Sequence, residues 1–186
     1  MSFILLGILN SQVSAAGGGA AYDLLETTVL TSSASSITFS GLDAYTDYKH
    51  LQVRAVARNS NGNYNSEMNV QFNGVSGTSY AYHYVYGSSA SGVSSTDGME
   101  DIWVTGNSYA PNRYGGIVMD ILDFASTNKN TTVRSLSGFG GFNSQIRFTG
   151  GLFVNTSAIT SITFDSYVPT QDLHSGTRIS LYGVKG

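Results

Sequence analysis

The sequence predicts an all-β protein: an antiparallel two-sheet sandwich, jelly-roll-like, with an extended N-terminal arm. Charged residues make up only 11% of the 186 residues, against about 25% in a typical globular protein. Short runs rich in β-branched and aromatic residues recur between Gly, Ser, Asn and Thr, and no window has the periodicity of an amphipathic helix. A closed barrel would show the same periodicity and stays open as the alternative.

The length favours one globular domain preceded by an apolar segment. We expect a docking arm with a Gly/Ala linker over residues 1–21 and a single β-sandwich domain over residues 22–186. The arm contains six large apolar side chains and no charged residue. They are Phe3, Ile4, Leu5, Leu6, Ile8 and Leu9.

Three interpretations of this segment compete. The triplet Val13-Ser14-Ala15 resembles a signal-peptide cleavage site, but a signal peptide needs a basic n-region and the first basic residue is Lys49. A transmembrane helix needs about 20 apolar residues, many more than this run offers. We therefore favour an arm that buries its apolar side chains in a partner, ahead of packing back on its own domain and of a signal peptide.

The remaining chain divides into short strands separated by turn signals. Alternation on the third of them places Leu51, Val53, Ala55 and Ala57 on one face, with His50, Gln52, Arg54 and Arg58 opposite. Three stretches are expected to be surface loops: Gly87–Gly98, Gly106–Gly115 and Val168–Gly176. The expected strands are Asp23–Leu30, Ser36–Ser40, His50–Arg58, Glu67–Asn73, Ser79–Tyr86, Glu100–Thr105, Gly116–Phe124, Thr132–Gly138, Gln145–Val154, Ile159–Asp165 and Arg178–Val184.

Composition also bears on function. The net charge is −3 and the nine Lys and Arg residues are scattered, which argues against a nucleic-acid partner. Without cysteine there are no disulfides and no thiolate metal ligands. We expect no cofactor, no metal and no membrane span.

The titratable residues form no recognisable catalytic or metal-binding motif. His50, His83 and His174 lie on separate segments, without a second histidine at ligand spacing. Glu100-Asp101 and the Asp120/Asp123 pair could hold a hard cation, but solvated surface carboxylates are the preferred interpretation because no Asp-rich loop appears. There is no Gly-x-Ser-x-Gly motif, and nothing singles out a carboxylate pair for glycoside hydrolysis. We expect a protein that is not an enzyme.

The sharpest local pattern is the alternating run Tyr80, Tyr82, Tyr84 and Tyr86. In a strand these four side chains share one face. They could form a sugar-binding platform that Trp103 joins, or a subunit contact. The favoured interpretation is that they line the sandwich core or a subunit contact, because tyrosine suits sites that are apolar at one end and wet at the other.

Several stretches together resemble small β-rich virion proteins of tailed bacteriophages, particularly those of cyanobacteria and marine bacteria. These stretches are Met1–Gln12, Tyr48–Arg54, Met119–Phe124, Asn128–Leu136, Gly151–Phe164 and Ser180–Gly186. The resemblance implies a place on the virion, on the capsid exterior or the tail, and brings no catalytic residue with it.

On this basis the first hypothesis is a capsid decoration (cement) protein, expected as a homotrimer, whose arm inserts into the major capsid protein or a neighbouring copy. The second is a tail or head fibre or baseplate component that attaches by its N-terminus to a tail or portal-proximal virion protein and binds host surface glycan. A glycan-degrading enzyme is the third.

Overall fold

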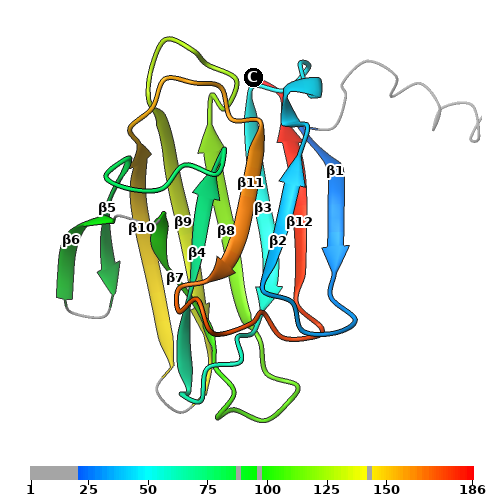
Figure 1. The fold of residues 1–186 in the computed structure, drawn as a ribbon, viewed down its shortest axis with the longest axis vertical. Helices are drawn as coiled ribbons and strands as arrows, with labels where there is room; N and C mark the ends of the chain where they lie inside the picture. The colour runs from blue at the N-terminus through cyan, green and yellow to red at the C-terminus, as the bar shows by residue number, and fades with distance from the viewer. Residues whose placement is uncertain (1–20, 87–88, 96–97, 142–143) are drawn as a thin grey trace, which may run out of the picture.

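The computed structural model describes residues 21–86, 89–95, 98–141 and 144–186. These residues form two antiparallel sheets packed face to face, joined by loops and one short 3-10 helix, η1 (Leu42–Ala44) (Figure 1). The predicted all-β class is therefore confirmed. The strands are β1 (Tyr22–Val29), β2 (Ser36–Ser40), β3 (His50–Ala57), β4 (Asn65–Phe72), β5 (Tyr80–Tyr86), β6 (Ser89–Ser95), β7 (Met99–Thr105), β8 (Gly115–Leu122), β9 (Thr131–Phe139), β10 (Gln145–Phe153), β11 (Ser161–Ser166) and β12 (Arg178–Val184).

The strand order is that of a jelly roll with two added hairpins. The large sheet has the order β1-β12-β3-β8-β9-β10-β5-β6 and the small sheet β2-β11-β4-β7. Four strand pairs are nested in the sequence: β1 with β12, β2 with β11, β3 with β8 and β4 with β7. Both sheets end in edge strands, so the sandwich describes the fold and the closed barrel does not. The β9–β10 and β5–β6 hairpins widen the large sheet beyond β8.

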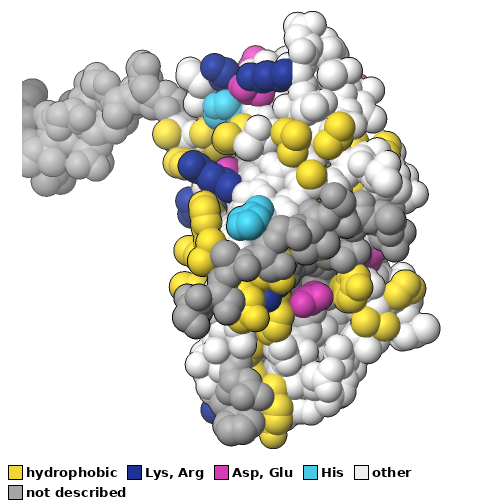
Figure 2. All heavy atoms as spheres, turned by 90° about the vertical axis from the view of Figure 1, so that its left-hand side faces the viewer, with side chains coloured by type: hydrophobic (Ala, Val, Ile, Leu, Met, Phe, Trp, Pro, Cys, Tyr) yellow, Lys and Arg dark blue, Asp and Glu magenta, His cyan; other side chains and the backbone are white. Residues whose placement is uncertain are grey.

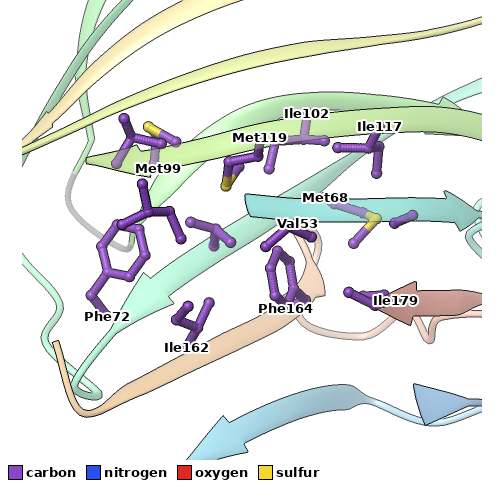
Figure 3. Packing of buried hydrophobic residues seen from close by; sticks show 14 of the residues in the cluster. Val53, Met68, Phe72, Met99, Ile102, Ile117, Met119, Ile162, Phe164 and Ile179 are labelled. Carbon is purple, nitrogen blue, oxygen red and sulfur yellow. The ribbon is translucent and has the colours of Figure 1, made fainter. Parts of the chain in front are cut away.

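The core lies between the two sheets and follows the predicted alternation (Figure 3). Val53, Met119 and Ile179 of the large sheet face Met68 and Phe164 of the small one, and all five are fully buried. Burial of side chains this large contributes about 1.5–3 kcal/mol each. The inward set predicted for β3 is confirmed, because Leu51, Val53, Ala55 and Ala57 are all buried.

Two sequence expectations about this framework were wrong. The stretch Gly87–Gly98, expected to be a loop, contains β6, which pairs with β5 over its whole length. Its Ser-rich sequence has no apolar alternation to signal a strand, so backbone pairing with β5 sets its conformation. Arg58, expected on the solvent face, is only 1% exposed.

Arg58 is buried because its side chain hydrogen-bonds to the loop Gly106–Gly115, which follows β7 and was predicted from the sequence. Its guanidinium donates to the carbonyl oxygens of Ala110 at 2.8 Å and Tyr109 at 2.9 Å, and to Oδ1 of Asn107 at 2.8 Å. A guanidinium fork matches several converging acceptors, which offsets part of the cost of removing it from water. The loop is therefore fixed to the end of β3.

Tyr80 ties the added β5 strand to the jelly roll. Its hydroxyl accepts a hydrogen bond from the Phe72 N–H at 2.9 Å and donates to the Val75 carbonyl at 2.9 Å. Its ring packs against Phe153, with centroids 5.1 Å apart. Burial raises the pKa of the Tyr80 phenol, while the hydrogen bond from Phe72 opposes the shift.

We predict that Tyr80→Phe lowers the free energy of unfolding by about 1–3 kcal/mol, because it leaves a buried N–H and a carbonyl without their partner. Urea denaturation followed by circular dichroism measures the change. Tyr22→Phe is the matched control. Because Tyr22 is 45% exposed, this substitution should change the free energy of unfolding by no more than about 0.5 kcal/mol. Equal effects of the two substitutions would contradict the role given to the Tyr80 hydroxyl.

Candidate functional site

The sequence-predicted site residues fall into three groups. The six arm residues Phe3, Ile4, Leu5, Leu6, Ile8 and Leu9 lie outside the described residues. The four stripe tyrosines do share one face of β5, and this face points into the sandwich. Tyr80 is 1% and Tyr82 7% exposed. These two rings are core residues, as the favoured interpretation of the stripe predicted, and cannot belong to an exposed sugar platform.

The other three aromatic residues gather around one cation, Arg147 of β10. The guanidinium carbon lies 4.0 Å from the ring centroid of Tyr84, 4.2 Å from Trp103 and 4.8 Å from Tyr86. Antiparallel pairing places Arg147 directly opposite Tyr86. Trp103 comes from β7, the edge strand of the small sheet, whose N–H at this position donates to Ser137 Oγ at 3.0 Å.

This aromatic cluster already contains its cation. Arg147 is 3% exposed, and its burial lowers the pKa of the guanidinium, an effect that the nearby carboxylate of Glu67 opposes. Since a guanidinium lies over the three rings, the cluster joins the edge of the small sheet to the large sheet, and a sugar would have to compete with Arg147 for ring surface.

Asp120 and Asp123, the carboxylate pair considered as metal ligands, are engaged in ion pairs and hydrogen bonds. Asp120 accepts from Gln52 and from Arg134, each at 2.8 Å. The Lys129 ammonium bonds Asp123 and lowers the pKa of that carboxyl. Within the part of the chain that the structure describes, no group of three or more acidic or histidine side chains converges on a metal-sized site.

The outer face of the small sheet is polar. Cross-strand pairing aligns Thr38 with Thr163 and Thr163 with Gln71, and Asp165 pairs with Ser36 beside them. Four of these residues line a depression of about 440 Å³ together with the loop after β11: Ser36, Gln71, Thr163 and Asp165. This is the ordinary pattern of a sheet with one buried and one solvated face.

Part of the outer face of the large sheet is apolar, and sequence reasoning missed it. Register places Val118 beside Leu136, Leu136 beside Phe148, and Phe148 beside Val85, so that four strands contribute one continuous row. Hydrophobic side chains form a band along the left margin of Figure 2, which views the β5–β6 side. We call apolar face the six residues Val56, Val85, Val118, Leu136, Ile146 and Phe148, which are between 39% and 64% exposed.

The apolar face exists because β9 and β10 are inverted relative to their sequence pattern. In β10, Ile146 and Phe148 point to solvent, whereas Arg147 and Thr149 are buried. In β9, Leu136 points outward while its neighbours Ser135 and Ser137 are buried. The signal that could have revealed the face was the apolar run Ile117–Met119 in β8, which supplies side chains to both faces of the sheet, beside the alternation in β9 and β10.

A shallow groove runs across this face. Two depressions, of about 700 Å³ and about 460 Å³, share Ala55, Ile117 and Val118 in their linings. The larger reaches Ile146 of β10, and the smaller reaches Leu24 of β1. A Cβ added at Gly116 in the larger one would meet no heavy atom within 4 Å, so the groove is open above this strand.

Comparison with protein-family models and with curated proteins gives no match for this chain. Among the described residues, no helix has both the length and the apolar character needed to cross a bilayer.

We predict that Arg147→Ala lowers the free energy of unfolding by about 2 kcal/mol or more, because it removes the cation–π contacts and leaves a cavity among three rings. Trp103 is the single tryptophan of the chain, so its fluorescence emission should shift to longer wavelength as water enters. Arg134→Ala is the control, since Arg134 is an exposed partner of Asp120 and should cost less than about 1 kcal/mol. Unchanged stability and emission in Arg147→Ala would contradict this assignment.

Proposed function

We propose that this protein is a structural component of a tailed-bacteriophage virion, and specifically a capsid decoration protein that docks on the shell. The observation that supports the proposal best is the apolar face of the large sheet. Monomeric proteins rarely expose contiguous apolar patches beyond a few hundred Å², and larger ones mark interaction sites. The resemblance of several stretches to phage virion proteins supplies the kind of particle.

The opposite character of the two outer faces supports an oriented attachment. The apolar face can be buried against the shell, where release of water from its side chains favours binding. The polar face of the small sheet then points to solvent. The N-terminal arm is the second docking element in this proposal, and the major capsid protein is its proposed partner. A homotrimer is the proposed assembly on the shell.

The alternative is a tail or head fibre or baseplate component, attached by its N-terminus, that binds host glycan. Tyr84, Tyr86 and Trp103 keep part of their surface exposed, which favours retaining this second candidate. The copy number per virion distinguishes the two functions: hundreds of copies over the shell indicate decoration, and a few at one vertex indicate a fibre. Addition of host glycan should leave Trp103 fluorescence unchanged in a decoration protein.

We predict that Leu136→Glu weakens binding to particles stripped of this protein at least tenfold, because docking would bury an unpaired carboxylate. Co-sedimentation with the particles measures binding. The fold should persist, since Leu136 is 48% exposed. Thr38→Glu is the matched control, with the same new side chain at an exposed position on the polar face. Undiminished particle binding by Leu136→Glu would refute docking through the apolar face.

We predict that deletion of Met1–Gln12 leaves the sandwich folded and abolishes attachment to particles. Every described strand of the two sheets lies after the deleted residues, since the first of them begins at Tyr22. Circular dichroism tests the fold and co-sedimentation tests attachment. If the truncated protein decorates particles as well as the full-length chain, the arm has no docking role.

A further inference from the structure

The groove on the apolar face begins at the strand where the N-terminal segment joins the fold. Leu24 of β1 lines the smaller of its two depressions, and β1 is an edge strand of the large sheet. The residues that precede β1 are those of the apolar arm. The groove and the arm are therefore adjacent along the chain. The arm and the larger depression are apolar, and the smaller depression next to β1 also contains the side chains of Arg54 and Arg178.

We propose that in the free protein the groove is occupied by residues 3–9 of the same chain. The lengths agree. From β1 to β10 the sheet has five inter-strand steps, or about 24 Å at the usual spacing. Seven extended residues span about 23 Å. The intervening residues 10–20 reach up to about 36 Å, which is more than enough to bring the segment back over the sheet.

The side chains of residues 3–9 also match the groove chemically. The segment has no charged group to desolvate and contributes six large apolar side chains. The groove is bordered by Val118 and Ile146, and above Gly116 it is open to an entering side chain. Each partner would thus cover apolar surface of the other.

The same chain is the favoured occupant because it is always present. A short tether gives its segment an effective concentration in the millimolar range, far above that of a second molecule in dilute solution. This occupancy covers the apolar face before assembly. Docking on a particle then displaces the segment, which frees both the face and the arm for the partner. Occupancy of the groove concerns the isolated protein and does not depend on the proposed function. Only the displacement of the segment by a particle does.

Disulfide trapping in the full chain tests the proposal, because the natural sequence has no cysteine. The test variant combines Leu6→Cys with Gly116→Cys, in the groove. The matched control combines Leu6→Cys with Gly150→Cys, an exposed glycine of the same sheet face that also has open space around it but does not line the groove. We expect the disulfide within one chain to close at least tenfold faster in the test variant. Adding Leu136→Glu should remove this difference.

Equal closure rates in the two variants would overturn the proposal. So would disulfides formed mainly between chains, which would identify a second copy as the occupant of the groove. Both readouts use purified protein without particles. Failure of the trapping experiment is thereby distinguishable from failure of the particle-binding experiments that test the proposed function.

Discussion

The register of β9 and β10 is the constraint on which both the interior and the exterior of this protein depend. Successive side chains of a strand point to opposite faces, so a shift of one residue would exchange every inward group for an outward one. Phe139 pairs with Gln145, and Phe153 pairs with Thr131 at the other end of the ladder. Both phenylalanines are buried, and they hold the register in which Arg147 points inward and Phe148 outward.

This register has a cost inside the sandwich. Ser135 and Thr149 face each other across the β9–β10 ladder in the interior, each about 1% exposed, where apolar side chains would pack better. The buried guanidinium of Arg147 adds to that cost, and its aromatic neighbours offset part of it. The same two strands thus place polar groups inside and apolar groups outside. Such an exchange is understandable if the outer side chains serve a contact rather than the stability of the monomer.

Much of the fold could be predicted from the sequence because most strands obey simple alternation. The inward residues of β3 follow directly from it, and so does the two-sheet class. The inverted strands could not be predicted in the same way, since alternation alone assigns Ile146 to the core and Arg147 to solvent. Arg58 and β6 were missed for related reasons. Their placement depends on partners distant in the sequence, the loop at Ala110 and the β5 backbone, and no local pattern encodes them.

The nesting of strand pairs has a consequence for how the chain reaches its native state. The pair β1–β12 joins Tyr22 to Val184, so the first strand of the domain finds its neighbour only when the last has been made. Contacts this distant in sequence require closure of a long loop, and folds dominated by them form slowly. Until β12 arrives, β1 has no partner strand. We therefore expect β1 to join the large sheet late in folding, after β12 has formed.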